Sequence, residues 1–436
     1  MKNALFPLFF LVSALSLSAQ PNDVPVLSAA EAVQIALANN YDIQLARADA
    51  EIAHLNNTKG NAGMLPNVAL VAGDNATLNG LQIQNLADGR LIEAYGVFSN
   101  NINASVQLEW TLFDGRRMYI TKNRLNEIEA LGQINLQAAV QQTTAEVLLR
   151  YYDIVRSQQQ ERALAEVIAL NEERLRIAEA RLAAGMAAQT DALQARIDLN
   201  QRKADLLAQQ TATLVAKREL NRLLARDPGT SFTVDEGLQP AYNPDREALL
   251  QKIQTQNPAL LSLQKSADVA ALSVREAQTL GKPRIVGLSQ LGGARTDNGA
   301  GFLLNNSSMG LTVGAQLNLP LYTGGNIRRQ VEVAKVQAQQ SATRLDAQRL
   351  ALSAALDDQL AYYQTSRQAL ALEEENVVNA RENLKVSTER FRLGQTNALE
   401  TQTAQNSLEQ ALLRRNLALY NLKVGELQLR LLAGEL

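Results

Sequence analysis

The chain has 436 residues and no cysteine, and its 42 lysines and arginines nearly balance its 44 aspartates and glutamates, giving a net charge of −2. A chain with so little net charge has no basic field to attract nucleic acid, so we expect no nucleic-acid partner. Without cysteine there is no disulfide framework, thiolate metal site or cysteine nucleophile, and we expect no lipid anchor attached through cysteine.

Residues 1–20 have the pattern of a secretory signal peptide. A basic start is followed by an apolar run from Ala4 to Leu17 and by small residues around Ala19, where we expect cleavage. A membrane helix is the alternative, but this short run, which contains Pro7, is too short for a span. No later stretch is apolar over the length of a helical span, so strands would have to make any membrane crossing.

The first helix is expected over residues 28–61. Ser28 and Glu31 have the spacing of a capping box, and apolar residues recur after them at helical intervals. Residues 68–73 are expected to begin a strand. Residues 74–101 are rich in asparagine and glycine, which predicts a long hairpin connection to the next strand.

The strongest pattern in the first half is an alternating strand followed by a very long helix. Residues 102–112, Ile-Asn-Ala-Ser-Val-Gln-Leu-Glu-Trp-Thr-Leu, are apolar at every even position and polar at every odd one. This period of two predicts a strand with one dry and one wet face. Residues 116–184 contain no proline and a single glycine, so we expect a helix of about 100 Å, too long for an ordinary globular domain.

A return helix and a linker complete the first half. Gly185 is expected to end the long helix in a left-handed conformation, and the return helix follows over residues 190–226. The return helix carries an apolar stripe formed by Leu193, Ile197, Ala204, Leu207 and Leu214. Residues 230–243 have little pattern and are interpreted as a linker.

The second half repeats the order of the first. Asn243-Pro244 is expected to cap a helix that runs to Gly281. We then expect a strand over residues 284–291 and a glycine-rich loop over residues 292–301. A second alternating strand is expected over residues 311–321, which begin 209 residues after the first (311 − 102 = 209).

The second long helix is expected over residues 325–393 and a last helix over residues 397–432. The long helix has a seven-residue apolar repeat with small residues between its members, which predicts a coiled-coil seam. The repeat consists of Leu370, Val377, Leu384 and Phe391.

The spacing of four glycines indicates an internal duplication. Gly115 and Gly185 are separated by 70 residues, as are Gly324 and Gly394 (185 − 115 = 394 − 324 = 70). We therefore divide the chain into a signal peptide (1–20), a first repeat (21–229), a linker (230–243) and a second repeat (244–436).

The alternating strands suggest a membrane. Strands of about eleven residues can cross a bilayer, with the even-numbered side chains of residues 102–112 facing lipid and the odd-numbered ones facing water. Four strands per chain cannot close a barrel, and open edges are not tolerated in lipid. Several chains would share one barrel: two copies give eight strands, three give twelve, and a water-filled lumen favours the larger number. A half-buried soluble sheet is the alternative, because it shows the same alternation.

The tandem strand-to-long-helix repeat, the motif Ala-Val-Gln-Ile-Ala-Leu-Ala-Asn-Asn at residues 32–40 and the paired hairpins resemble the TolC-type outer-membrane efflux channel family over the whole mature chain. The resemblance implies a mainly helical homotrimer, in which a shared twelve-stranded barrel in the lipid of the outer membrane continues into a long antiparallel coiled-coil tunnel in the periplasm.

The resemblance also implies a function. It implies a passive exit duct for small molecules or proteins, opened when an inner-membrane pump and a periplasmic adaptor (membrane fusion) protein dock. We expect no catalysis, no cofactor and no metal site. The alternative from another class is an extracytoplasmic coiled-coil scaffold or adaptor without a membrane barrel.

Family members narrow the tunnel with acidic side chains just after the helix hairpins, so the resemblance implies a periplasmic aperture after the tip glycines Gly185 and Gly394. Six residues after these glycines lie Asp191 and Glu400, and the family's second acidic position falls on Thr403. Copies of an acid around an axis would attract cations and repel anions. Helix capping is the alternative, because Glu400 lies close to capping-box spacing and Asp191 suits a helix N-terminus.

Two positions depart from the family pattern. The gate-locking tyrosine three residues before the second tip glycine is Phe391 here, which has no hydroxyl to donate a hydrogen bond. The arginine two residues after that glycine is Thr396, which cannot form a salt bridge. If this tip has a closed state, other contacts must hold it.

Other conspicuous residues suggest structural roles. Residues 292–301 lack the Lys-Ser/Thr ending of a phosphate loop. His54, the only histidine, lacks partners for a triad or metal cluster and is expected to be solvated or packed. The pairs Tyr151-Tyr152 and Tyr362-Tyr363 are expected to be packing residues, and Glu373-Glu374-Glu375 a solvated face.

Overall fold

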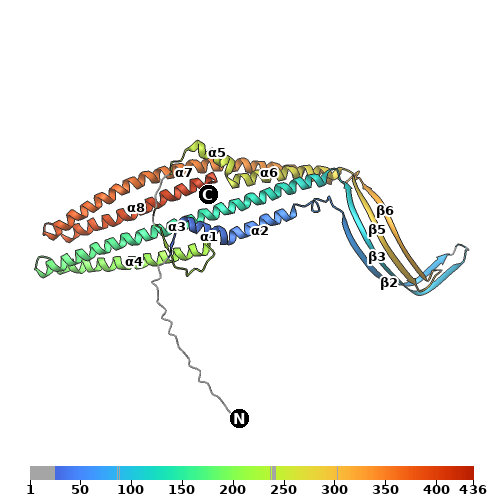
Figure 1. The fold of residues 1–436 in the computed structure, drawn as a ribbon, viewed down its shortest axis with the longest axis horizontal. Helices are drawn as coiled ribbons and strands as arrows, with labels where there is room; N and C mark the ends of the chain where they lie inside the picture. Colours follow the sequence, from blue (N-terminus) through green and yellow to red (C-terminus); the bar gives the residue numbers. More distant parts are fainter. Residues whose placement is uncertain (1–24, 86, 88, 236, 238–241, 302) are drawn as a thin grey trace, which may run out of the picture. The chain divides into compact units, whose positions relative to one another are not determined.

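The computed structural model describes residues 25–85, 87, 89–235, 237, 242–301 and 303–436 (Figure 1). The predicted signal peptide, residues 1–20, lies outside the described residues. The described chain is mainly helical and contains a four-stranded antiparallel sheet together with a short two-stranded one.

The order of elements confirms the predicted internal duplication, because helices, a strand pair, a long helix and a return helix follow one another twice. The elements of the first half are β1 (Val26–Leu27), α1 (Ala29–Asn39), α2 (Tyr41–Asn56), β2 (Asn67–Asn85), β3 (Leu91–Phe113), α3 (Arg117–Ala183) and α4 (Gln189–Leu223). Those that follow are β4 (Thr233–Val234), α5 (Arg246–Gln256), α6 (Pro258–Ala277), the 3-10 helix η1 (Gln278–Gly281), β5 (Arg284–Asn298), β6 (Asn305–Asn318), α7 (Asn326–Arg392) and α8 (Ala398–Ala433).

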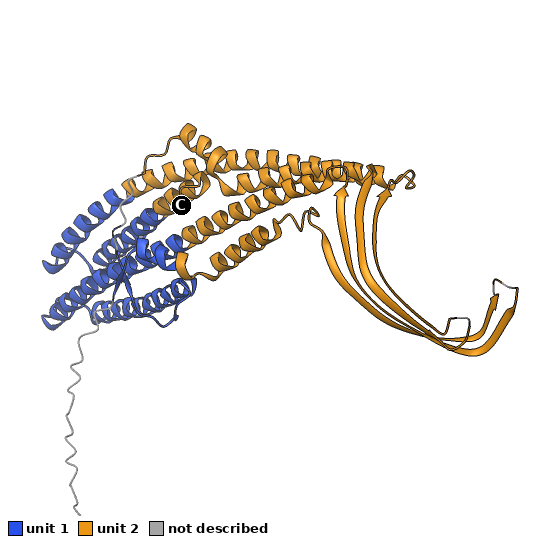
Figure 2. Cartoon of the chain, turned by 45° about the vertical axis from the view of Figure 1, so that its right-hand side comes forward, with its two compact units in different colours: residues 1–36, 147–239, 373–420 blue, residues 37–146, 240–372, 421–436 orange. Residues whose placement is uncertain are grey.

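The chain forms two compact units, coloured separately in Figure 2. Unit 1 contains residues 147–239 and 373–420 together with the chain up to residue 36. Unit 2 contains residues 37–146, 240–372 and 421–436, and therefore the whole four-stranded sheet. Both long helices contribute residues to each unit.

The two long helices, α3 and α7, confirm the strongest helical prediction. Each has 67 residues and ends within two residues of its predicted bounds. The predicted seam of α7 is buried at all four positions, with relative exposures of 8%, 7%, 4% and 1% in chain order. Among the described residues, none of the helices combines the length and the apolar character of a membrane-crossing helix.

The shorter helices differ from prediction because asparagine caps divide them. The helix predicted over residues 28–61 is two helices, since the Asn40 side chain accepts hydrogen bonds from the backbone N of Asp42 and Ile43 and starts α2. In the second repeat, Asn257 likewise caps α6 by accepting from the backbone N of Leu260 at 3.0 Å. Asparagine competes with the helical backbone for hydrogen bonds, which makes it a good cap and a poor interior residue.

The predicted cap of α1 is confirmed, whereas the predicted cap of α5 is not. The capping box is confirmed, because Ser28 Oγ accepts from the backbone N of Glu31 at 3.2 Å and the Glu31 carboxylate accepts from the backbone N of Ser28 at 2.8 Å. The cap predicted at Asn243-Pro244 is wrong. Asp245 caps α5 instead, by accepting from the backbone N of Ala248 at 2.9 Å.

The strands are longer than predicted, and two predicted loops are wrong. Residues 74–101 are paired strand over most of their length, since β2 and β3 pair from Asn67↔Glu109 to Asn85↔Leu91. Most of the loop predicted over residues 292–301 belongs to β5, which pairs with β3 on one side and β6 on the other. Asparagine and glycine are poor strand formers, but backbone pairing with neighbouring strands outweighs this preference.

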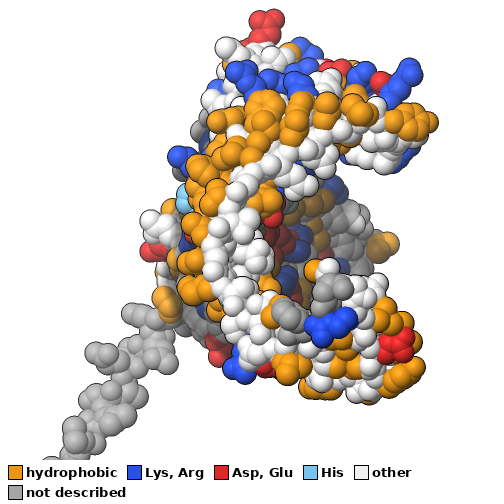
Figure 3. All heavy atoms as spheres, turned by 90° about the vertical axis from the view of Figure 1, so that its right-hand side faces the viewer, with side chains coloured by type: hydrophobic (Ala, Val, Ile, Leu, Met, Phe, Trp, Pro, Cys, Tyr) orange, Lys and Arg blue, Asp and Glu red, His pale blue; other side chains and the backbone are white. Residues whose placement is uncertain are grey.

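The sheet has the order β2-β3-β5-β6 and two chemically distinct faces. One face is apolar and exposed in the single chain; it includes Val68, Leu70, Val106, Trp110, Leu291, Leu311 and Val313. The other is polar and includes Asn103, Ser105, Gln107, Gln290, Thr296 and Thr312. Figure 3 shows hydrophobic side chains gathered along one side of the strands. The alternation predicted for residues 102–112 is therefore confirmed.

The predicted linker takes part in the core of unit 1. Phe232 and Val234 are 2% and 6% exposed and pack with residues of α1, α3 and α4. β4 also pairs with β1 in parallel, joining Leu27 to Val234. The sequence signal for this role is weak, because β4 has only two residues and the period of so short a strand cannot be recognised.

Tyr151 joins the three segments of this core. Its hydroxyl donates to the backbone O of Leu27 at 2.9 Å and accepts from the backbone N of Asp235 at 3.0 Å. Burial raises the pKa of Tyr151 to about 12. In the second repeat Tyr363, 2% exposed, donates to the backbone O of Tyr242 at 2.7 Å. The packing role predicted for the tyrosines is confirmed for Tyr151 and Tyr363, whereas Tyr362 is 42% exposed.

His54, although exposed, has a partner. Its Nδ1 lies 2.7 Å from Oε1 of Glu129 on α3, a contact within unit 2 that the sequence did not reveal. The hydrogen bond to Glu129 raises the pKa of His54 above 6.5. A histidine whose pKa is raised by folding adds stability that is complete below pH 6.5 and lost as the pH rises through the raised pKa.

We expect Tyr151→Phe to lower the free energy of unfolding by about 1–3 kcal/mol, because a buried N–H and C=O lose their partner. Denaturant unfolding in detergent, followed by circular dichroism, measures this change. Tyr119→Phe, which alters an exposed tyrosine of the same helix, is the matched control and should change stability by less than about 0.5 kcal/mol. Equal effects of the two substitutions would contradict the role assigned to Tyr151.

We expect the single histidine to titrate above 6.5 and Glu129→Gln to lower its pKa, because the substitution removes the negative acceptor. NMR of the protein labelled at histidine measures this titration without overlap, since the chain has one histidine. Glu51→Gln, which removes a weaker electrostatic influence, should lower the pKa less. A pKa unchanged by Glu129→Gln would refute the contact.

Candidate functional site at the hairpin tips

The two helix hairpins of unit 1 end in the same turn. Gly185 and Gly394 have φ values of 73° and 76°, the left-handed conformation predicted for Gly185. The residue after each glycine donates its backbone N–H back to the helix: Met186 to Arg181 O and Gln395 to Arg390 O, both at 2.8 Å. The turns place the predicted aperture residues at the start of α4 and α8.

Asp191 lies in the first turn of α4 and is half-buried. The capping position, Ala188, has no side-chain cap, so Asp191 is the acid that complements the positive end of the helix. Within the described residues it makes no ion pair. It lines a cavity of about 300 Å³ together with Arg174, Phe391 and Gln402.

Glu400 is held by its own hairpin. Its backbone N donates to the Asn397 side chain at 2.9 Å, which confirms a cap at this helix start. Its carboxylate does not complete a capping box, because it accepts from Arg390 at 2.8 Å and from the hydroxyl of Thr396. The negative charge of Glu400 is therefore balanced by Arg390, whereas no ion pair among the described residues balances the charge of Asp191.

Phe391 is fixed without a hydroxyl. Its side chain is 1% exposed, and the Arg181 guanidinium lies 4.7 Å from the ring centroid. Arg181 also donates to the backbone O of Phe391 at 2.9 Å. Because Arg181 belongs to the first hairpin and Phe391 to the second, this contact joins the two tips.

Thr403 adds no charge to the tip. It is exposed on α8, and its hydroxyl donates to the backbone O of Leu399 at 2.9 Å, a bond within the helix. Of the predicted site residues, the structure brings Asp191 and Phe391 to one cavity and joins Glu400 to Thr396.

A buried ion pair that the sequence did not reveal joins the same helices. Arg174 is 4% exposed and pairs with Asp198 of α4. The Asp198 carboxylate also accepts from Gln402 of α8 and from Gln194, both at 2.8 Å. These partners satisfy a buried carboxylate across three helices. Nothing in the sequence distinguishes Arg174 from the exposed arginines near it.

A second acid, Glu409 on α8, is only 8% exposed and lies 3.1 Å from Arg202 of α4. Burial raises the pKa of Glu409, and Arg202 opposes this increase. Its protonation therefore favours the folded state, so the stability that Glu409 contributes decreases as the pH rises through the interval between 4.5 and the raised pKa.

Two further acids of the long helices form ion pairs, Glu173 between the hairpins and Glu373 within the second hairpin. Glu173 accepts hydrogen bonds from Arg176 and, in the other hairpin, from Arg392; these bonds lower the pKa of Glu173 to about 2 against a smaller opposite effect of burial. Glu373 pairs with Arg414 at 3.0 Å. The solvated face predicted over Glu373-Glu374-Glu375 is therefore wrong for Glu373.

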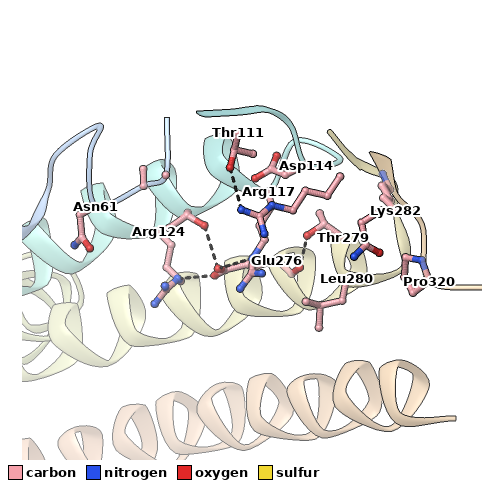
Figure 4. A pocket seen from close by; sticks show the side chains of 15 residues that line it. Asn61, Thr111, Asp114, Arg117, Arg124, Glu276, Thr279, Leu280, Lys282 and Pro320 are labelled. Carbon is pink, nitrogen blue, oxygen red and sulfur yellow. Dashed lines mark hydrogen bonds and ion pairs between the residues drawn. The ribbon is translucent and has the colours of Figure 1, made fainter. Parts of the chain in front are cut away.

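A polar cavity of about 620 Å³ lies in unit 2, where the strands meet the helices (Figure 4). Glu276 is its central acid: it accepts from the Thr121 hydroxyl at 3.0 Å and pairs with Arg124 at 2.8 Å and Arg117 at 3.4 Å. Arg284 also lines this cavity. In the part of the chain that the structure describes, no three histidine, aspartate or glutamate side chains gather as a metal ion would require.

The chain matches the family model described as "Outer membrane efflux protein" over residues 32–226 and 249–435, one match in each half. Protein CyaE of Bordetella pertussis is 28% identical over 261 residues, which cover 59% of this chain and 54% of CyaE. Outer membrane efflux protein BepC of Brucella suis is 25% identical over 310 residues, which cover 70% of this chain and 65% of BepC. The matched regions thus span between about half and two thirds of these two relatives.

A solved structure has the same fold. The outer membrane protein VceC from Vibrio cholerae superposes with a TM-score of 0.76 over 93% of this chain and 96% of VceC, at 16% identity. The mainly helical fold with a strand part is therefore that of a known outer membrane protein.

We expect Arg181→Ala to loosen the contact between the tips, because it removes a hydrogen bond and a cation–π contact together worth about 1–3 kcal/mol. Hydrogen exchange at residues 391–396 should accelerate. Arg222→Ala, which removes an exposed arginine paired only within α4, is the control and should leave this exchange unchanged. Equal exchange in both variants would show that Arg181 does not hold the tip.

Proposed function

This chain belongs to the outer membrane efflux protein family, and we propose that it forms the passive exit duct of a tripartite efflux or secretion system. It is a protein of the outer membrane. In this proposal a homotrimer shares one barrel of twelve strands, and the helices continue it as a tunnel through the periplasm. The two repeats, residues 21–229 and 244–436, each supply two strands and one helix hairpin.

The observation that carries the proposal is the two-faced sheet with two unpaired edges. In the described sheet β2 and β6 lie at the ends and pair on one side only. An apolar face suits lipid, but every backbone N–H and C=O in lipid must be paired. Pairing β2 of one chain with β6 of the next removes both edges and places the polar face around a water-filled lumen.

The return helix supports assembly with further copies. The predicted apolar stripe of α4 is largely uncovered by the described chain, since Leu193, Ile197, Leu207 and Leu214 are between 49% and 65% exposed. Other residues of α4, among them Ala195, Leu199 and Leu220, face the chain's own core. Exposed apolar stripes of this kind mark protein interfaces, and the neighbouring copy is the partner we propose.

We propose that the aperture carries a ring of Asp191 carboxylates. Three unpaired acids around an axis attract cations and repel anions. Glu400 contributes less to this ring, because Arg390 and Thr396 already hold its carboxylate. In this proposal three contacts between the hairpins keep the resting tip closed, in place of the missing tyrosine and arginine. Arg181 donates to Phe391, Arg392 pairs with Glu173, and Gln402 donates to Asp198.

In this proposal a periplasmic adaptor and an inner-membrane pump open the tip and deliver the cargo. A change in the tip contacts is sufficient for opening because each hairpin is a separate element with its own turn. The cargo passes without covalent change.

We expect the protein to fractionate with the outer membrane, to require detergent for extraction and to form ion-conducting channels in planar bilayers. Asp191→Asn should lower the K⁺/Cl⁻ permeability ratio several-fold, and Glu400→Gln should lower it less, because only Asp191 is unpaired. Glu375→Gln, an exposed acid of α7 away from the tip, is the control and should leave the ratio unchanged.

Extraction without detergent, or the absence of channels from the purified trimer, would refute the duct. Channels whose permeability ratio responds equally to Asp191→Asn and Glu375→Gln would refute the aperture but not the duct.

A further inference from the structure

The polar face of the sheet is almost free of charge. Across its four-stranded part this face carries amides, hydroxyls, glycines and a few aliphatic side chains. Among the described residues there, only Glu109 of β3 and Arg284 of β5 are ionised. The other charged residues of this part, Asp74, Arg295 and Asp297, belong to the opposite face, as their pairing with Ile102 and Asn100 shows. Glu93 of β3 lies beyond the four-stranded part, where β3 pairs with β2 alone.

Glu109 and Arg284 are partners. Arg284 Nη2 lies 3.5 Å from Glu109 Oε1 and donates to Thr111 Oγ1 at 3.2 Å. Both residues lie near the end of the sheet that joins the helices, since β3 ends at Phe113 and β5 begins at Arg284. The sequence does not reveal that Glu109 and Arg284 are partners, because 175 residues separate them (284 − 109 = 175).

Fold stability does not explain the pair. The Glu109 and Arg284 side chains are 57% and 54% exposed, and exposed ion pairs contribute little to stability. Two uncharged polar side chains at these positions would be equally compatible with the strand pairing, as the neighbouring asparagines and glutamines are. The opposite charges therefore point to a role in the space that this face borders.

We propose that Glu109 and Arg284 form a charge-balanced ring at the helix end of the barrel, so that the strand part of the duct passes solutes of either charge. This inference deepens the proposed function and depends on it, because it requires the polar face to border the lumen. Selection by charge then belongs to the acids of the hairpin tips. The cargo class is polar solute or polypeptide without a required sign of charge.

The balance depends on both members of the pair. Loss of Arg284 would leave one unpaired carboxylate per chain, and loss of Glu109 one unpaired guanidinium per chain. The four-stranded part of this face carries no other charge among the described residues. Such a ring acts across a water-filled lumen over about 10 Å at 0.1 M salt and only about 3 Å at 1 M. Its effect on ions should therefore fade at high salt.

A cycle of variants in planar bilayers tests the proposal. The background is Asp191→Asn with Glu400→Gln, so that the tip acids do not dominate the reversal potential. In a KCl gradient at about 0.1 M, Arg284→Gln should raise the K⁺/Cl⁻ permeability ratio several-fold and Glu109→Gln should lower it. The double variant should return to the background value, and all three differences should shrink at about 1 M salt.

Cysteine labelling tests directly which face borders the lumen. The chain has no cysteine, so a single introduced thiol is the only target. In the same bilayers, a charged membrane-impermeant thiol reagent should change the conductance of Glu109→Cys. It should leave Leu108→Cys, whose side chain lies on the apolar face, unaffected.

The outcomes separate this inference from the function it depends on. Channels whose permeability ratio is the same in both single glutamine variants would overturn the charge-balanced ring and leave the duct intact. A double variant that differs from the background would show that the residues do not compensate each other. No channels in the wild-type protein would overturn the proposed function itself.

Discussion

The backbone groups at the edges of the sheet impose the constraint on which the assembly depends. At their outer edges β2 and β6 each present a row of N–H and C=O groups that pair with no other strand of the described chain. Water can satisfy such groups, but lipid cannot. The apolar side chains beside these edges suit lipid better than water. The closed ring that we propose supplies the missing backbone partners from other copies of the chain.

The same constraint explains why the sequence predicted the elements better than their lengths. The alternation of residues 102–112 is a local signal of two different environments, and it identified β3 correctly. The rest of β3 and most of β2 are rich in asparagine and glycine, and they are extended because each pairs with the other. Such pairing joins distant residues, so a local pattern cannot reveal it. The break at Asn257 has a local signal that the prediction did not use, since Pro258 follows the cap at the first helical position. The break at Asn40 has no such proline, and its only signal is the asparagine itself.

The spacing of the tip glycines predicted the turns of the two helix hairpins. It did not predict the contacts that join one hairpin to the other. The hydrogen bond expected to be lost at Phe391 is replaced through its backbone carbonyl, which every residue has and which Arg181 reaches from the other repeat. The ion pair between Arg174 and Asp198 is likewise a contact that no sequence motif reveals. Their importance arises from burial, and burial between helices distant in sequence has no signature at the residue itself. The contacts between the hairpins run in both directions, since Arg181 of the first hairpin reaches Phe391 and Arg392 of the second reaches Glu173.

The placement of charge is consistent with the physics of an aqueous duct. A charge influences a passing solute only within about a screening length, roughly 8–10 Å at physiological salt. In the proposed trimer an unpaired acid is therefore effective where the path is narrow, and the unpaired Asp191 lies at the hairpin tips. In the wider strand part an unpaired charge would hold counter-ions without selecting cargo. There the chain carries amides and hydroxyls, with one acid beside one base. A duct that must release what a partner delivers gains from binding nothing along its length, because each favourable contact inside it would slow the exit.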